Sequence, residues 1–355
     1  MKELQYQFTN IANLATRERF FNKLSSDISL STYRELQIAV KIEADPLHDR
    51  LAALDGFRAI RFDNEYSTLE SSLDLIQIIC AKRAKYSSMH LRIWTGTTKR
   101  ADEVREMLEK CVADVVIQDP VFTIDWHYLD GKGVSSALID ELATDKLVDA
   151  AYPSITEGVH QFIDRYLDAD QPVLVVHGPP GTGKTRLIRG ILGEMARRSS
   201  DACRVMFTGD AELLKRDEIF MRFIGSGHKA FVVEDADHLL KPRKDGNESM
   251  HRFLTISDGI VRAQGRKIIF SSNLPNLGDL DDALIRPGRC FACVTLPRLA
   301  KESVEKLIPA LQTDKLFAAD MHTRLLGGGE KSVSLAEIYR ALGERIVHAA
   351  PSVAC

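Results

Sequence analysis

The sequence has neither a large excess of one sign of charge nor a long apolar run. Its 47 Lys and Arg residues nearly balance its 50 Asp and Glu residues, which leaves a net charge of −3. This balance gives no reason to expect nucleic acid or an anionic membrane as a partner. No stretch approaches the roughly 18 apolar residues of a membrane-spanning helix, and the first residues, MKELQYQFTN, lack the apolar segment of a signal peptide. We therefore expect no membrane span.

Cysteine is also scarce, with six residues in a chain of 355. So few cysteines in so long a chain do not form a disulfide framework, and we expect a cytoplasmic protein. Cys290 and Cys293 are spaced as CxxC, but the sequence has no second such pair and no nearby histidine pair to complete a zinc site. Their surroundings, RCFACVTLP, are typical of a strand. We interpret both as core residues, with a metal or redox role as the alternative.

The C-terminal part of the chain contains short apolar runs that alternate with helical patterns. A helical pattern over residues 185–198 follows the first run, and from residue 299 onward the pattern is helical, over 300–311, 314–326 and 334–350. Alternation of this kind predicts a parallel sheet covered by helices on both faces. The expected strands are residues 172–177, 203–209, 229–235, 267–273 and 291–297.

The N-terminal part predicts a separate α/β (or α+β) domain over residues 1–148, without a motif that carries chemistry. We interpret Trp94 and Trp126 as core aromatics there, with a binding surface as the alternative. Helical patterns are predicted over residues 67–86 and 98–112. Strands are predicted over residues 36–42, 57–62, 90–96, 114–118 and 121–129.

The stretch GPPGTGKT, which begins at Gly178, fits the phosphate-binding pattern G-x-x-x-x-G-K-[ST]. Glycines let several backbone N–H groups point at phosphate oxygens, and the following helix adds its positive end. Lys184 is expected to reach the β- and γ-phosphates of ATP, and the Thr185 hydroxyl to ligate Mg²⁺. The residues expected to bind the nucleotide are Gly178, Pro179, Pro180, Gly181, Thr182, Gly183, Lys184, Thr185 and Arg186.

Acidic residues follow a second apolar run, in AFVVEDADHLL. Glu234 and Asp235 come directly after four apolar residues, at the carboxyl end of an expected strand. Ligands of open α/β sheets bind at that edge. One acid is expected to hold Mg²⁺, and the next to polarise the attacking water.

Together these motifs resemble those of the AAA+ ATPases, and within them the AAA family proper. GPPGTGKT is identical to that family's Walker A segment, and FVVEDAD is similar to its Walker B segment. Residues 267–289, KIIFSSNLPNLGDLDDALIRPGR, resemble its second region of homology. The resemblance extends from about residue 152 to the C-terminus. It implies a P-loop AAA+ parallel-sheet domain over residues 149–298 and a helical lid over residues 299–355.

The resemblance also implies roles for single residues. Asn273 matches the sensor-1 residue, which helps to place the attacking water. Arg286 and Arg289 match the arginine fingers, which in this family face the adjacent subunit of a ring, usually a hexamer. Because Glu234 precedes Asp235, the reverse of the usual order, strand register gives Glu234 the magnesium position and Asp235 the catalytic one. The opposite assignment stays open. A similar order occurs in relatives of the mitochondrial translocase of the Rieske protein.

We expect the chain to be an ATP hydrolase that works as a homo-oligomeric ring to remodel, translocate or disassemble a protein client, with the N-terminal domain selecting the client. A nucleic-acid-linked AAA+ loader and a nucleotide-gated scaffold with little hydrolysis are the alternatives. Many relatives thread a client past an aromatic loop. Here the expected position holds LLKRDE, from Leu213 onward, and we interpret the nearby Phe220 and Phe223 as core residues, with a pore role as the alternative.

Overall fold

The computed structural model describes residues 2–26, 28–83, 86–131, 133–241, 253, 265–274, 286, 288–311 and 332–348. The chain divides into two compact units. The first unit is made of residues 1–123, 140–143 and 196–203, and the second of residues 124–139, 144–195 and 204–355. In the part of the chain that is described, no helix is both long and apolar enough to cross a membrane.

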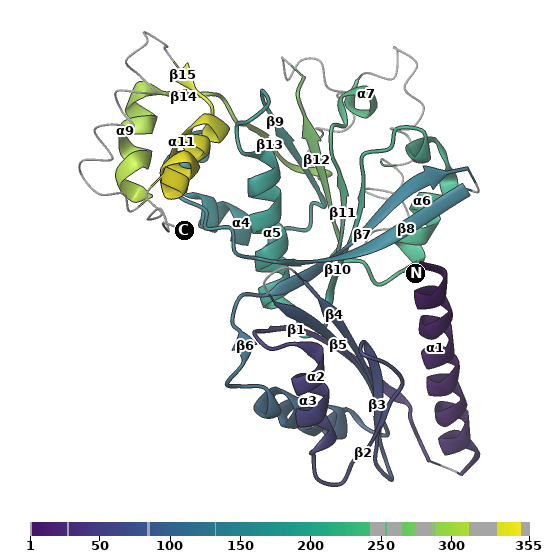
Figure 1. The fold of residues 1–355 in the computed structure, drawn as a ribbon. Coiled ribbons are helices and arrows are strands. Elements are labelled where there is room, and N and C mark those ends of the chain that lie inside the picture. Colours follow the sequence, from purple (N-terminus) through teal and green to yellow (C-terminus); the bar gives the residue numbers. More distant parts are fainter. Residues whose placement is uncertain are drawn as a thin grey trace. The chain divides into compact units, whose positions relative to one another are not determined.

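The second unit contains a seven-stranded sheet in the order β13-β9-β12-β11-β10-β7-β8 (Figure 1). Neighbouring strands from β13 to β10 are parallel. All five residues of β9 are buried, as expected for a parallel strand that is covered on both faces. The five strands predicted from residue 172 onward are confirmed. They are β9 (Val173–His177), β10 (Cys203–Thr208), β11 (Ala230–Val233), β12 (Lys267–Ser272) and β13 (Cys290–Thr295).

Helices follow these strands where the apolar spacing predicts them. Buried phenylalanines of α6 pack against apolar side chains of β11 and β12 in a single core cluster. The predicted helix over residues 314–326 lies outside the described residues. The helices of the second unit are α4 (Val159–Asp168), α5 (Lys184–Arg198), α6 (Asp217–Gly225), α7 (Asp237–Leu240), α9 (Lys301–Ala310) and α11 (Leu335–His348), with short 3₁₀ turns at Asp149–Ala151 and Leu213–Lys215. The short strands β14 (Leu299–Ala300) and β15 (Ser332–Val333) pair with each other.

Strands β7 (Val121–Asp130) and β8 (Gly133–Leu142) belong to the sheet of the second unit, beside β10. The Thr208 hydroxyl of β10 donates to the His127 carbonyl of β7 at 3.0 Å. The sequence places a domain boundary near residue 148, whereas residues 124–139 fall in the second unit. Hydrophobic alternation marks a strand but does not say which sheet it joins, so this difference was not visible in the sequence.

The first unit is built on a six-stranded antiparallel sheet in the order β2-β3-β4-β5-β1-β6 (Figure 1). Leu47 and Leu51 of α2 and Leu108 of α3 share a buried cluster with the apolar side chains of the sheet. Helix α1 contacts β3 and β4, where Gln77 donates to Asn13 at 3.1 Å. The elements are α1 (Lys2–Ser25), β1 (Thr32–Val40), α2 (Ala44–Ala52), β2 (Arg58–Arg61), β3 (Tyr66–Glu70), β4 (Leu75–Lys82), β5 (Ser87–Thr95), α3 (Thr98–Cys111) and β6 (Val116–Ile117).

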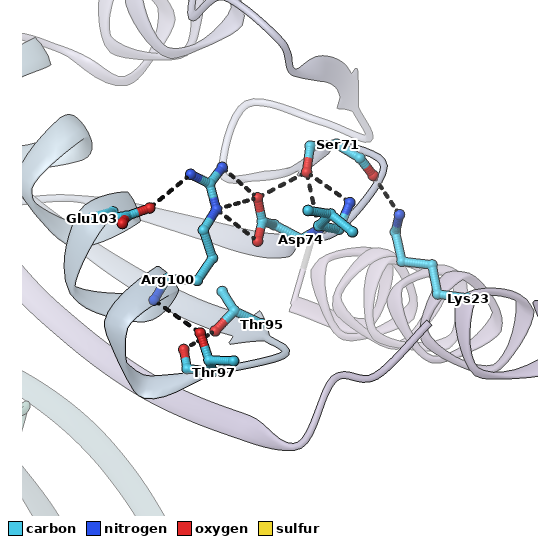
Figure 2. Close-up of polar contacts among 8 residues, drawn as sticks. Lys23, Ser71, Asp74, Thr95, Thr97, Arg100 and Glu103 are labelled. Atoms are coloured by element: carbon cyan, nitrogen blue, oxygen red, sulfur yellow. Dashed lines mark hydrogen bonds and ion pairs between the residues drawn. The ribbon is translucent and has the colours of Figure 1, made fainter. Parts of the chain in front are cut away.

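The predicted helix over residues 67–86 is wrong, because β3 and β4 occupy that range. A polar turn between the strands separates them. The Ser71 hydroxyl accepts hydrogen bonds from the backbone N–H groups of Leu73 and Asp74, which is a local alternative to helix formation. Figure 2 shows the Asp74 carboxylate between the Ser71 hydroxyl, at 2.8 Å, and the Arg100 guanidinium, with its closest contact also at 2.8 Å. The cluster SSLD was the signal for a turn.

We predict that Asp74→Ala destabilises the protein by about 2–3 kcal/mol, because it leaves Arg100 without a buried partner and removes an acceptor for Ser71. Chemical denaturation of the full-length protein measures this change. Glu103→Ala is the matched control. Glu103 is the exposed partner of the same guanidinium, and its loss is expected to cost less than about 0.5 kcal/mol. Equal effects of the two substitutions would contradict the importance of the buried contact.

Candidate functional site

The register of the parallel strands brings the predicted site residues to one edge of the second sheet. His177, the last residue of β9, pairs with Ser272, the last residue of β12. Val233, the last residue of β11, pairs with Phe270 of β12. The loop after β9, Asn273 after β12 and the acids after β11 therefore emerge side by side, at the edge where open α/β sheets bind ligands.

The glycines of the loop after β9 adopt backbone conformations that other residues rarely take. Gly178, Gly181 and Gly183 have φ angles of 149°, 80° and 94°. A Cβ atom on Gly178 would overlap the carbonyl oxygen of Leu296, and one on Gly183 would lie 2.6 Å from the Leu335 side chain. The pattern of glycines in the sequence therefore has a steric cause in this fold.

Lys184 begins helix α5 and folds back over this loop. Its side chain is nearly buried, and Nζ donates to the carbonyl oxygens of Gly178 at 2.7 Å and Pro179 at 3.1 Å. Burial lowers the pKa of Lys184, and the negative charges of Asp235, Asp237 and Glu234 oppose that shift. The three acids thus favour the charged form of the ammonium group, against the larger effect of burial.

Asn273 connects this lysine to the acids after β11. Its Oδ1 accepts from Lys184 Nζ at 2.8 Å, and its Nδ2 donates to Asp235 Oδ1 at 2.9 Å. The chemistry of the two partners fixes the orientation of the amide, because an ammonium only donates and a carboxylate only accepts. Asn273 is therefore held between a cation and an anion of the site.

Glu234 and Asp235 are directed differently by the backbone. Glu234 continues the strand, and its N–H donates to the Thr208 carbonyl at 3.2 Å. Its Oε1 accepts from the Thr185 hydroxyl at 2.8 Å. Asp235 has a φ of 50°, in the left-handed region, and its side chain is exposed. Aspartate tolerates this conformation better than most residues. The turn separates the two carboxylates, one toward Thr185 and one toward Asn273.

Asp237 is a residue of the site that the sequence analysis did not single out. Its Oδ1 accepts from the Ser272 hydroxyl at 2.6 Å and from the Asn273 backbone N–H at 2.7 Å. It therefore anchors the backbone on which the Asn273 amide is carried. The signal in the sequence was the third acid of the run EDAD.

The start of helix α11 and Tyr152 contact the other side of the glycine loop. The Ala336 N–H donates to the Gly181 carbonyl at 2.9 Å, and the Tyr152 hydroxyl to the Gly183 carbonyl at 3.3 Å. Arg186, which the sequence analysis placed among the nucleotide-binding residues, lies with its guanidinium 4.1 Å from the centre of the Tyr339 ring.

Arg289 lies beside the first residue of β9, away from the glycine loop. The Arg289 carbonyl accepts from the N–H of Val173, the first residue of β9, at 3.2 Å. The glycine loop begins after the last residue of β9, about 13 Å further along the strand. Arg286 is exposed. The two arginines thus lie toward the opposite end of β9 from the loop.

The phenylalanines, cysteines and tryptophan expected in the core differ in their burial. Phe220 and Phe223 are 4% and 0% exposed and pack in the core cluster, so their core interpretation is confirmed. Cys290 and Cys293 also pack against this cluster, with their sulfur atoms 3.9 Å apart. Trp126 is 43% exposed, so its core interpretation is wrong; on β7, it packs against only one ring, that of Tyr128, among the described residues.

Comparison with known proteins supports an AAA+ ATPase domain in the second unit. Residues 174–298 match the family model described as ATPase family associated with various cellular activities (AAA). The chain is also similar to proteins named ATP-dependent zinc metalloprotease FtsH. The match with that of Acidimicrobium ferrooxidans has 25% identity over 189 residues, 50% of this chain and 28% of the relative. The match with that of Marinobacter nauticus has 28% identity over 243 residues, 62% of this chain and 38% of the relative.

The match with FtsH of Caulobacter vibrioides, at 28% identity, likewise covers 49% of this chain and 29% of the relative. The chain thus spans well under half the length of these relatives. Its second unit has the α/β P-loop fold that the family model implies.

We predict that Gly178→Ala destabilises the protein by about 2–4 kcal/mol, because the new methyl group meets backbone and the φ of 149° is unfavourable for alanine. Thermal and chemical denaturation measure the loss. Gly209→Ala is the control, since a Cβ atom there has its nearest neighbour at 3.9 Å. A stable Gly178→Ala protein would show that the loop has another low-energy conformation.

Proposed function

We propose that this chain is an ATP hydrolase of the AAA type that works in a ring and uses ATP to remodel a protein client. The observation that carries the proposal is the run of contacts from Lys184 through Asn273 to Asp235, beside the Thr185–Glu234 contact. Phosphoryl transfer to water requires a cation, a polar amide and acids of this kind at the phosphate-binding edge of a P-loop sheet.

The residues present fit Mg²⁺ and ATP. The glycine loop offers backbone N–H groups at the start of α5, which suits phosphate oxygens. Thr185 and Glu234 supply a hydroxyl and a carboxylate 2.8 Å apart, both of them ligand types that Mg²⁺ prefers. When bound, Mg²⁺ would neutralise charge on the β- and γ-phosphates.

The contacts support separate roles for the two acids. Since Glu234 is paired with Thr185, we assign Glu234 to the metal. Since Asp235 is exposed and hydrogen-bonded to Asn273, we assign Asp235 and Asn273 to the attacking water, with Asp235 accepting its proton. Lys184 holds the phosphate chain and balances its charge. Asp237 is a positioning residue, because it acts on Asn273 through the backbone.

The position of the arginines supports a site completed by a neighbouring subunit. Arg289 lies toward the amino end of β9, whereas the phosphate-binding loop follows its carboxyl end. We therefore propose that Arg286 and Arg289 stabilise the transferring phosphoryl group of the adjacent subunit, in a hexameric ring.

The proposed client is a protein, and the first unit selects it. Phe220 and Phe223 are the two phenylalanines of the segment between β10 and β11, and both are buried. Leu213 and Leu214 are buried too. The burial of these four residues leaves no aromatic pore loop at this position of the described chain, which supports action on a folded client or a complex over threading of an unfolded chain. It also supports the likeness to the Rieske-protein translocase type.

Mixing two inactive variants tests completion of the site between subunits. We expect Arg289→Ala to lower kcat at least 100-fold while ATP still binds, and Asp235→Asn to abolish turnover. Rings assembled from equal amounts of both contain sites with an intact Asp235 and a neighbour's Arg289. About a quarter of the wild-type steady-state ATPase rate should return if subunits mix at random. Arg222→Ala, which removes a surface ion pair, is the activity control. No recovery in demonstrably mixed rings would exclude the trans assignment.

Asp237→Ala tests the positioning role. We expect kcat to fall about 10- to 100-fold, because the Asn273 backbone loses its acceptor, with little change in the Kd for ATP. His238→Ala, at the exposed neighbouring position, should leave both unchanged. Steady-state kinetics and equilibrium nucleotide binding separate the two quantities. A change in Kd alone would assign Asp237 to binding instead.

A further inference from the structure

Two histidines and an aspartate meet in the second unit, outside the nucleotide site. Asp125 and His127 are two residues apart on β7, so their side chains share one face of the strand. His228 lies just before β11. Asp125 Oδ2 is 3.1 Å from His127 Nε2 and 3.0 Å from His228 Nε2. One ligand atom from each residue lies within 4.8 Å of the other two.

The polar atoms of this cluster are not all satisfied by hydrogen bonds. His127 is 0% exposed, and within the described part of the chain neither of its ring nitrogens has a hydrogen-bond partner. Its Nε2 is close to the Asp125 carboxylate but not aligned for a hydrogen bond. Asp125 Oδ1 is likewise buried without one among those residues. Buried polar atoms without partners are unfavourable, which indicates that another group satisfies them.

The second histidine is oriented by a residue behind it. The Nδ1 atom of His228 is hydrogen-bonded to the Ser226 hydroxyl, and its Nε2 faces Asp125. Histidines that bind metals commonly use one nitrogen as the ligand and the other for such an orienting hydrogen bond. With Nδ1–H donating to Ser226, the Nε2 lone pair is available to a cation.

We propose that Asp125, His127 and His228 bind a divalent transition metal ion of the Zn²⁺ class, with water as a fourth ligand. Two imidazoles and a carboxylate suit Zn²⁺, Co²⁺ or Fe²⁺ better than Mg²⁺ or Ca²⁺, which prefer oxygen ligands. Metal–ligand distances near 2.0–2.1 Å place tetrahedral ligands about 3.3 Å apart. The two carboxylate–imidazole contacts of 3.0 and 3.1 Å need small outward shifts to reach this spacing. The two imidazole nitrogens lie within 4.8 Å of each other and would close on the ion.

This site is distinct from the proposed magnesium site. His228 lies two residues before the first residue of β11, whereas Glu234 directly follows its last residue. Six residues of extended chain span about 20 Å. A bound ion would join β7 to the segment that leads into β11, across the intervening strand β10. The role we assign to it is to hold this part of the sheet together, and it does not depend on the proposed ATPase cycle.

Metal binding to the full-length protein tests the proposal. The protein is stripped with a chelator, kept free of nucleotide and Mg²⁺, and titrated with ZnCl₂ by calorimetry, with the bound metal measured by mass spectrometry. We expect one Zn²⁺ per chain and a rise in Tm on binding. Co²⁺ in its place should give the visible absorption of a four-coordinate ion with nitrogen ligands.

Variants assign the ion to the cluster. His228→Gln should abolish stoichiometric binding, and Ser226→Ala should weaken it about tenfold by freeing the His228 ring. His90→Gln is the matched control, since His90 contacts Asp140 at 3.0 Å in a histidine–aspartate pair without a second histidine. Thr185→Ala should also keep the ion, because it removes a residue of the magnesium site only. Circular dichroism checks that each variant is folded.

Two results would overturn the proposal. Absence of stoichiometric Zn²⁺ and Co²⁺ binding by the wild-type protein would leave the cluster as an aspartate shared by two histidines. Equal binding by wild type, His228→Gln and Ser226→Ala would place the ion elsewhere.

Discussion

The parallel pairing of β9 with β12, and of β12 with β11, is the constraint on which the candidate site depends. It brings three separate segments of the chain to one sheet edge, so that a lysine, an amide and two carboxylates come within hydrogen-bond distance. The backbone hydrogen bonds of the sheet thus determine the geometry of the charges. Asp237 adds a second restraint, because it binds the backbone where β12 ends.

Much of the second unit could be predicted because its strands are short, apolar and separated by helical patterns. The glycine pattern at Gly178 and the acids after β11 were visible for the same reason, since each combines residue type with a fixed place on a strand. Asp237 was overlooked because its role depends on a partner 35 residues further along the chain. The Asp125–His228 contact joins residues 103 positions apart, so no local spacing in the sequence indicates it.

The first unit was harder to predict, for physical reasons. The stretch LIQIICAK in β4 is apolar at nearly every position, because α2 and α3 cover one face of the sheet and α1 contacts the other. Without alternation, periodicity does not separate such a strand from a buried helix. The turn at Ser71 is the feature that separates the two strands. Side-chain hydrogen bonds stabilise this turn, and helix propensities do not take such bonds into account. Trp126 shows the converse, since an aromatic residue within a strand can be on its exposed face.

The division of the chain into alternating segments has a consequence for how its parts can be exchanged. Three segments of the first unit alternate with three of the second, so the polypeptide passes between the units five times, at residues 123/124, 139/140, 143/144, 195/196 and 203/204. Cleavage at any one crossing leaves four covalent connections. Gene fusion or recombination that replaced residues 1–123 alone would transfer an incomplete first unit, because residues 140–143 and 196–203 would stay behind.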